Sequence, residues 1–164
     1  MSQISVYLKL TAGDTEVKGD SSVQEMAGVD VSEMIECIAF QSGVSVGYDG
    51  RASRPTSDRA YEPITITKWV DRASPVLAQA LTETRQCTGE FNFFRPSHDG
   101  TGMEQYFKVK IENARIGRVK LGFDEGEDRS LVREEVQLVF SRITWTHGPG
   151  GTEHTDDWTR RPGS

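Results

Sequence analysis

The sequence predicts a mostly all-β fold, an antiparallel two-sheet β-barrel with one flanking α-helix. Several segments alternate apolar and polar residues with the period of a half-buried strand, and one segment has the spacing of a helix. The chain has 164 residues, of which 35% are hydrophobic, and this suffices for one thin core without disulfides or metals. Its apolar runs fall short of the ~20 residues of a membrane-spanning helix, so we expect no membrane insertion.

The alternating segments assign side chains to an inner and an outer face. In a strand, residues two apart point to the same side, so the apolar set of each segment faces the core. A denser run at residues 34–40 is apolar on both faces, and Phe94 adds an apolar group to the polar face of its segment. The inward sets that we predict are Ile4, Val6, Leu8 and Leu10; Ile64 and Ile66; Phe91 and Phe93; Phe107, Val109 and Ile111; and Val136, Leu138 and Phe140.

Two of these segments change phase along their length. After Ile111 the apolar positions shift to Ile116, and after Phe140 they shift as well. A bulge, a tight bend or burial on both faces each explains such a shift. Because a closed barrel requires long strands that bend, we expect bend sites at Asn113 and Gly117.

One helix is expected over about residues 74–84. Ser74 is a good N-cap, and Pro75 occupies a first-turn position where proline is tolerated. Leu77 and Leu81 lie one turn apart, and Gly89 follows the end of the segment. We expect this helix to cover an open end or a side of the barrel.

The barrel domain is expected to span residues 1–147, with a C-terminal tail over residues 148–164. The tail is rich in glycine and charge and is predicted to be loose, apart from Trp158, which is expected to dock on the body. The segment from Gly47 to Tyr61 is polar and rich in turn residues. A structureless loop of this length is uncommon in a compact domain and is usually functional or disordered.

Motifs that carry chemistry are absent from the sequence. It contains neither a Gly-x-Ser-x-Gly nucleophile turn nor a phosphate-binding glycine loop. Its histidines lack metal-ligand spacing and are expected to face solvent. The acidic run at residues 124–128 favours a hairpin loop over a calcium site, and Glu134 and Glu135 point to opposite faces of a strand. We therefore predict no enzyme activity, no cofactor and no metal site.

The net charge, the cysteines and the N-terminal sequence indicate which partners and which export route to expect. The net charge is −6, whereas binding to phosphates needs a basic surface, so we expect no nucleic-acid partner. Cys37 and Cys87 are predicted to be buried, reduced thiols, with a disulfide as the alternative. The N-terminus lacks a basic run and an apolar core, so no cleaved secretion signal is expected.

Five segments share an order and spacing that point to one family. From Ile66 to Leu77, an aromatic residue follows lysine and Asp-x-x-Ser-Pro precedes an apolar helix. Residues 134–145 form a final strand that ends in Trp-x-His. Residues 6–10 with 17–21, residues 35–40, and Asp157–Trp158 complete the pattern. Together they resemble the haemolysin-coregulated protein (Hcp) family of the type VI secretion system, with departures at Asp20, at His147 and in a missing tryptophan at 35–40.

This resemblance implies a structural subunit of the secretion tube. Six copies would form a ring, rings would stack into a tube that holds effector proteins, and a contractile sheath would drive the tube with a spike protein at its tip. The protein would start in the bacterial cytoplasm and be secreted to the extracellular space or a target cell without a signal peptide. Two alternatives stay open, a phage-like tail-tube protein and a monomeric β-barrel that binds a small ligand.

Charged residues in two segments are the candidate contacts with other copies. The long loop could reach the next subunit or ring, and a mobile surface loop is its alternative. The charged turn over residues 124–129 could lie at a ring face, and a solvated hairpin tip is its alternative. The candidates are Asp49, Arg51, Arg54, Asp58 and Arg59 on the loop, and Glu127, Asp128 and Arg129 on the turn.

Overall fold

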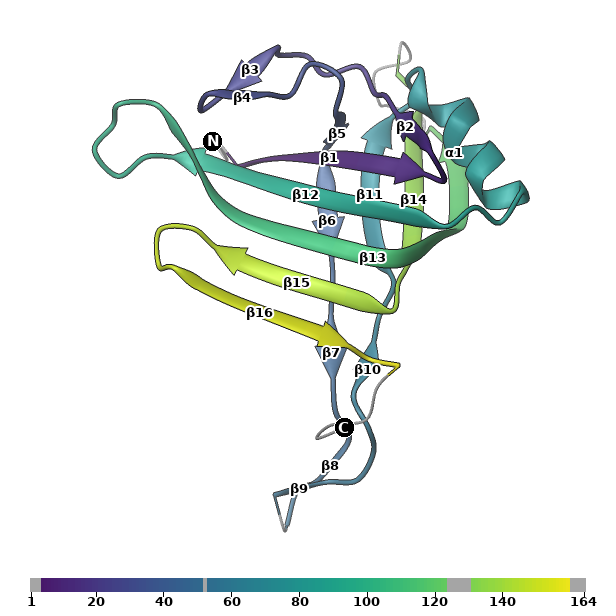
Figure 1. Cartoon of the computed structure of the whole chain (residues 1–164), viewed down its shortest axis with the longest axis vertical. Helices are drawn as coiled ribbons and strands as arrows, with labels where there is room; N and C mark the ends of the chain where they lie inside the picture. Colours follow the sequence, from purple (N-terminus) through teal and green to yellow (C-terminus); the bar gives the residue numbers. More distant parts are fainter. Residues whose placement is uncertain (1–3, 52, 124–130, 160–164) are drawn as a thin grey trace.

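Antiparallel pairing of long strands organises the chain (Figure 1). The computed structural model describes residues 4–51, 53–123 and 131–159. Its elements in chain order are β1 Ser5–Ala12, β2 Thr15–Val17, β3 Glu25–Met26, β4 Val29–Asp30, β5 Ile35–Cys37, β6 Ala39–Gln41, β7 Val44–Ser45, β8 Tyr48–Asp49, β9 Arg54–Pro55, β10 Ala60–Tyr61, β11 Ile64–Trp69, α1 Ala73–Thr82, β12 Cys87–Pro96, β13 Met103–Gly122, β14 Arg133–Val139, β15 Arg142–His147 and β16 Thr152–Asp157.

The main sheet curls, and the short segment 35–41 pairs with strands on both of its sides, β1 and β11. The strand order is β2-β1-β12-β13-β14-β11-β6, and β15 extends from β13 and carries β16. The segment 35–41 pairs with β1 through β5 and with β11 through β6. Between them, the Ile38 amide donates to the Thr67 carbonyl at 2.7 Å. The predicted antiparallel two-sheet barrel with one flanking helix is therefore confirmed.

Strand β13 belongs to both halves of this architecture. Its first half pairs with β12 and β15, and its second half pairs with β14. Between the halves Asn113 has a φ of 50°, a left-handed conformation that asparagine tolerates better than most residues. A register shift follows between Ile116 and Arg118, at Gly117. Both predicted bend sites are confirmed.

The core is filled by the apolar faces of the strands. Phe40 packs edge-to-face on Phe91 and Phe93, with ring centroids 5.0 Å apart in each pair. The predicted inward residues are buried except Ile4, which is 59% exposed, and Phe107, which is partly buried. The buried predicted residues are Val6, Leu8, Leu10, Ile64, Ile66, Phe91, Phe93, Val109, Ile111, Val136, Leu138 and Phe140.

A second, smaller cluster lies on the other face of the β1–β12 pair. Tyr7 and Phe94 meet there at a centroid distance of 5.8 Å, and Val31 is buried with them. This cluster accounts for the apolar group that Phe94 adds to an otherwise polar face. Cys37 and Cys87 are free and buried, as predicted. Within the residues that the structure describes, no helix has the length and apolar character to span a membrane.

Helix α1 packs on β13 and β2 and covers the side of the barrel, near the expected boundaries. The predicted N-cap is wrong, because Ser74 lies inside the first turn and the helix begins at Ala73. Asp71 performs the capping role from one residue before the flanking Arg72. Its Oδ1 accepts the Ala73 amide at 2.9 Å, and its own amide donates to Ser74 Oγ at 3.1 Å.

A buried charge cluster ties the start of α1 to the sheet. Lys68 and Glu134 are 0% and 1% exposed, and Lys68 Nζ lies 2.7 Å from Glu134 Oε1. Lys68 Nζ also donates to Asp71 Oδ1 at 2.8 Å, and Ser74 Oγ donates to Glu134 Oε1 at 3.0 Å. These contacts replace the water that Lys68 Nζ and Glu134 Oε1 lose on folding, whereas Glu134 Oε2 is buried without a hydrogen-bond partner among the described residues, so the carboxylate depends on Lys68.

We expect Lys68→Met to destabilise the fold by about 3–5 kcal/mol, because Glu134 would be left as an uncompensated buried charge. Lys68→Met combined with Glu134→Leu should recover most of this loss, since no charge then remains to be paired. Urea unfolding followed by circular dichroism measures both. Lys18→Met is the control, because the Lys18–Glu33 pair is half exposed and should contribute under about 1 kcal/mol. An unchanged urea midpoint in Lys68→Met would contradict the cluster's role.

Candidate assembly surface at the β7–β10 ribbon

The segment between β6 and β11 projects from the barrel as a narrow ribbon (Figure 1). It consists of two short antiparallel ladders, β7 with β10 and β8 with β9. The sequence does not decide whether the segment from Gly47 to Tyr61 is ordered, and the structure shows the short strands β8, β9 and β10 within it. The turn residues that suggested a loop instead provide the hydrogen bonds that hold the ribbon together.

Gly47 is central to these contacts. Its carbonyl accepts the Thr56 amide at 2.7 Å, and its amide donates to Ser57 Oγ at 3.0 Å. A Cβ at this position would lie 2.6 Å from Ser57 Oγ, so a larger residue would displace the hydroxyl that accepts the Gly47 amide. At the tip, the Ser53 amide donates to the Asp49 carbonyl at 2.8 Å and closes the turn.

An apolar stripe runs along the ribbon. Val44, Val46 and Tyr48 are 49%, 41% and 73% exposed and follow one another at every second residue along the first arm of the ribbon. The ribbon lies outside the barrel (Figure 1), and these three residues are not members of the core cluster. An exposed group of apolar side chains on a projecting element is typical of a surface that contacts another molecule.

The structure divides the predicted loop residues into two groups. Asp49 and Arg54 face each other across the β8–β9 ladder, and Asp49 Oδ1 accepts the Arg51 amide at 2.9 Å, so these three lie at the tip. Asp58 and Arg59 lie at the base of the ribbon, beside the barrel. The predicted turn residues Glu127, Asp128 and Arg129 fall outside the described residues.

Arg59 fastens the base of the ribbon to β16. Its Nε contacts Asp156 Oδ2 at 2.5 Å, and its terminal nitrogen contacts Asp156 Oδ1 at 3.0 Å, which gives a bidentate ion pair. The Tyr61 hydroxyl donates to Asp156 Oδ2 at 2.6 Å. We call Arg59, Tyr61 and Asp156 the base clamp. Because the Arg59 guanidinium is bound by Asp156 of the same chain, the clamp fixes the direction in which the ribbon leaves the barrel.

The base clamp changes the pKa values of Asp156 and Tyr61. Hydrogen bonds from Arg59 hold the pKa of Asp156 below its ordinary value, although partial burial opposes them. Burial raises the pKa of Tyr61 to about 12, and its hydrogen bond to Asp156 adds to this shift. The Asp156 contribution is therefore present above the ordinary aspartate pKa and is lost as the pH falls through the lowered value. The Tyr61 contribution is present below the ordinary tyrosine pKa and is lost as the pH rises through about 12.

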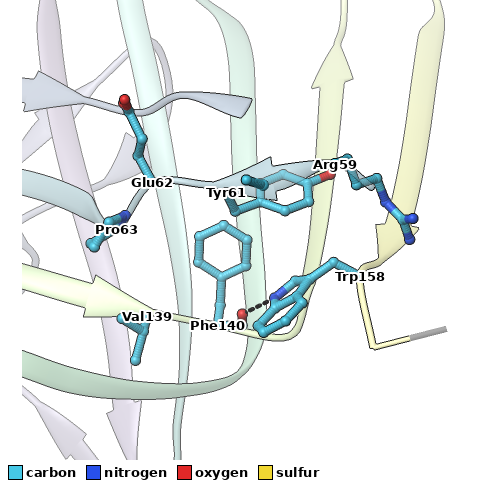
Figure 2. Close-up of a pocket in the computed structure, with 8 residues that line it drawn as sticks. Arg59, Tyr61, Glu62, Pro63, Val139, Phe140 and Trp158 are labelled. Atoms are coloured by element: carbon cyan, nitrogen blue, oxygen red, sulfur yellow. Dashed lines mark hydrogen bonds between the residues drawn. The ribbon is translucent and has the colours of Figure 1, made fainter. Parts of the chain in front are cut away.

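Beside the clamp lies a surface pocket of about 560 Å³ (Figure 2). Tyr61 and Phe140 meet in it at a centroid distance of 5.4 Å, and the Trp158 indole nitrogen donates to the Phe140 carbonyl. Ala60, Pro63 and Val139 complete its apolar lining, with Arg59 and Glu62 as charged groups. The pocket opens at the surface of the molecule, outside the packed interior of the barrel.

The C-terminal segment contributes to this site. The prediction of a loose tail is wrong for Thr152–Asp157, because this segment forms β16 and pairs along all of β15. The predicted docking of Trp158 is confirmed, since its amide also donates to the Ser141 carbonyl at 3.0 Å. Strand β16 therefore positions both Asp156 of the clamp and Trp158 of the pocket.

The polar surface around β15 and β16 carries two of the histidines. His154 stacks on Trp145 at a centroid distance of 5.8 Å, and His147 Nδ1 accepts the Gly150 amide at 3.0 Å. Across the described ranges, no three histidine, cysteine or carboxylate side chains gather as a metal site would require. The site's chemistry is thus that of contact surfaces, with apolar side chains, paired charges and exposed strand edges.

Sequence reasoning missed both ionic clusters. Lys68 shares the phase of Ile64 and Ile66, and Glu134 that of Val136, so the alternation itself places both charges in the core. The burial of Lys68 and Glu134 could therefore have been predicted from the alternation. For the base clamp no local signal exists, because Arg59 and Asp156 lie 97 residues apart and meet only after the barrel forms.

The chain thus combines a β-barrel with a packed core, a projecting ribbon and apolar groups on its outside. Residues 7–147 match the family model described as "Type VI secretion system effector, Hcp". A relative from Pseudomonas aeruginosa, named "Major exported protein", is 34% identical over 155 residues, which cover 91% of this chain and 87% of the relative. The chain belongs to the Hcp family of type VI secretion proteins.

Solved structures agree with this assignment. A crystal structure of an Hcp protein has a TM-score of 0.82 at 24% identity and covers 94% of this chain and 99% of its own. A mutant form of the Hcp1 protein from E. coli EAEC 042 has a TM-score of 0.79 at 28% identity and covers 94% and 98%. Hcp3, a secreted protein from Pseudomonas aeruginosa, has a TM-score of 0.74 at 25% identity and also covers 94% and 98%.

We expect Asp156→Asn to release the ribbon without unfolding the barrel. Amide hydrogen exchange over residues 44–61 should accelerate about tenfold, because charged hydrogen bonds contribute about 1.5–3 kcal/mol. In the unmodified protein, the same exchange should accelerate as the pH falls through the lowered pKa of Asp156, after correction for the intrinsic rate. Glu153→Gln is the control, because Glu153 is an exposed residue of the same strand β16 and lies outside the clamp. Equal protection in Asp156→Asn and the parent would refute the clamp.

Proposed function

We propose that this chain is a tube subunit of a type VI secretion system. Six copies close into a ring, and rings stack into an inner tube that carries effector proteins. A spike protein caps the tube, and a contractile sheath drives it. The protein leaves the bacterial cytoplasm for the extracellular space or a target cell without a signal peptide. Family membership and the name of the Pseudomonas relative support this proposal.

The observation that carries the proposal is the ribbon. It lies outside the barrel, is fixed at its base and presents an apolar stripe that leads to charged residues at its tip. A contact between such an element and a different surface of the next copy is head-to-tail, and head-to-tail contacts close into rings or continue as tubes. We assign the ribbon, with Asp49, Arg51 and Arg54, to a contact between copies.

The packing of the barrel helps to distinguish a tube subunit from a monomeric barrel that binds a small ligand. A ligand-binding barrel needs an internal cavity, whereas Val109, Ile111, Leu138 and Phe140 fill the space between the sheets here. This supports a structural subunit, neither an enzyme nor a small-ligand carrier. A phage-like tail-tube protein would use the same contacts, and the neighbouring genes distinguish it. The net charge of −6 supports protein partners over nucleic acid.

The purified protein should elute at about six times its 18.3 kDa mass, and electron microscopy should show rings and stacked rings. Deletion of residues 49–58 removes the ribbon tip and should abolish stacking, while the circular dichroism spectrum stays that of the parent. Thr88→Ala, an exposed change on β12, is the control for surface substitution. Monomers at high concentration would refute the proposed function, and unchanged tubes in the deletion would refute the role of the ribbon.

The charged turn over residues 124–129 is the second proposed contact, at a ring face. Reversal of Glu127 and Asp128 to lysine should weaken assembly, because the charges that face the next ring would change sign. Light scattering at two salt concentrations measures the effect, which should shrink as salt screens it. Assembly equal to that of the parent at both salt concentrations would assign this turn to solvent.

A further inference from the structure

The dipeptide Asp-Gly occurs twice in the sequence, and both copies lie in exposed turns. Asp49–Gly50 lies at the tip of the ribbon, and Asp99–Gly100 lies in the turn that joins β12 to β13. An aspartate before glycine can rearrange through a five-membered imide, because glycine carries no side chain that shields its amide nitrogen from the neighbouring carboxyl. Since the two sites share this dipeptide, their surroundings in the fold decide which of them reacts.

The rearrangement needs only water as a co-reactant. At the ribbon tip, the Gly50 nitrogen would form a bond to Asp49 Cγ, while the neutral carboxyl loses its hydroxyl, which leaves as water with the amide proton. A second water then opens the imide. Opening at the side-chain carbonyl restores aspartate, whereas opening at the main-chain carbonyl gives isoaspartate. In isoaspartate the chain runs through Cβ and Cγ and is one atom longer, and the former main-chain carbonyl belongs to a carboxylate.

The ribbon tip holds the reacting groups of Asp49 and Gly50 weakly. Strands β8 and β9 form a separate two-stranded sheet of two residue pairs, and so short an isolated ladder is marginally stable in water. In the described part of the chain, the Asp49 carboxylate accepts one hydrogen bond, from the Arg51 amide, and the Gly50 amide donates none. The attacking nitrogen is therefore available, and little opposes a rotation of the carboxyl toward it.

The same dipeptide at Asp99 is held on both sides of the bond that would form. Asp99 Oδ1 accepts hydrogen bonds from Ser97 Oγ at 2.8 Å, from Thr101 Oγ1 at 2.6 Å and from the Thr101 amide at 3.0 Å. The Gly100 amide donates to the Ser97 carbonyl at 3.2 Å, and the turn closes the long β12–β13 ladder.

These hydrogen bonds also make the Asp99 carboxyl less reactive. They lower the pKa of Asp99 to about 2 from its ordinary value of 3.8. At neutral pH this leaves about 60-fold less of the neutral carboxyl, the form that can lose its hydroxyl as water. Asp99 therefore combines a bound nitrogen with a carboxyl that stays ionised.

We propose that Asp49 is a site of isoaspartate formation in this protein and that Asp99 is protected from it. The product removes the main-chain carbonyl that accepts the Ser53 amide, and it lengthens the strand that pairs Asp49 with Arg54. The tip therefore changes shape without a change in mass or charge. The modification does not depend on the proposed function. Its effect on stacking does, because Asp49 and Arg54 belong to the contact that we assign to the ribbon.

The first test compares the two sites within one molecule. The full chain is kept in neutral buffer for several weeks, and its tryptic peptides 19–51 and 86–108 are then mapped. Electron-transfer fragmentation identifies the β-linked residue, and an isoaspartate-specific methyltransferase labels its carboxylate. Isoaspartate should accumulate at least about tenfold faster at Asp49 than at Asp99, as one pKa unit of protection alone would give. Equal rates at the two sites would overturn the proposal.

Two variants test the cause of the difference. Gly50→Ala should slow the reaction at Asp49 several-fold, and the turn accepts alanine because its Cβ would meet no atom within 4 Å. Ser97→Ala with Thr101→Val removes two of the three hydrogen bonds to Asp99 and should start the reaction there, since the pKa of Asp99 then rises toward its ordinary value.

Gly122→Ala is the matched control for the glycine substitution, because a Cβ at Gly122 also meets no atom within 4 Å. It should leave the rates at both sites as in the parent. An unchanged rate at Asp49 in Gly50→Ala, or at Asp99 in the double variant, would show that the local contacts do not control the reaction and would refute the assignment.

Stacking separates this inference from the proposed function. Aged parent should stack less than fresh parent, whereas aged and fresh Gly50→Ala should stack alike. If isoaspartate forms at Asp49 and stacking is unchanged, the effect on assembly is overturned while the modification stands. If the parent forms neither rings nor tubes, the proposed function fails, and the peptide map still decides whether Asp49 is modified.

Discussion

One strand that serves two sheets is the constraint on which this structure depends. Strand β13 can do so because Asn113 adopts a left-handed conformation and a bulge at Gly117 resets the register. The bend turns β14 and β11 across the β1–β12 pair, and the short segment 35–41 then reaches both sides. The apolar faces of all these strands converge on one filled interior. Among the described residues, this interior is packed with side chains from every strand that borders it.

Two ionic clusters organise this outer surface from opposite ends of β11. The buried Lys68–Glu134 pair fixes the start of α1 near one end, and the Arg59–Asp156 pair fixes the ribbon at the other. Each pair joins elements that are distant in sequence, so neither exists before the barrel closes. The direction of the ribbon is consequently a property of the whole fold and not of the ribbon's own sequence.

Alternation of apolar residues predicted the fold class, most of the core and both bend sites, because burial on one face has a period of two. It could not predict β16, whose exposed residues are all polar, nor the ribbon, whose strands are held by turn residues such as Gly47. The position of Lys68 in the alternation places it on the inner face with Ile64 and Ile66. It was nevertheless not predicted to be buried, because lysine is rarely buried without a partner and its partner Glu134 is distant in sequence. The acidic and basic loop residues were predicted as one contact group, but Arg59 is bound at the base by Asp156, a residue near the other end of the chain.

The burial of both thiols has a consequence for the redox chemistry of the chain. Burial raises the pKa of Cys37 to about 12 and also raises that of Cys87, so the reactive thiolate is scarce at neutral pH. They remain free, and strands cover both. Both sulfurs are therefore poorly exposed to oxidants, and no bridge joins them that a reductant could open. The strands of this barrel are held by packing and hydrogen bonds alone, and neither cysteine contributes a covalent link to the fold.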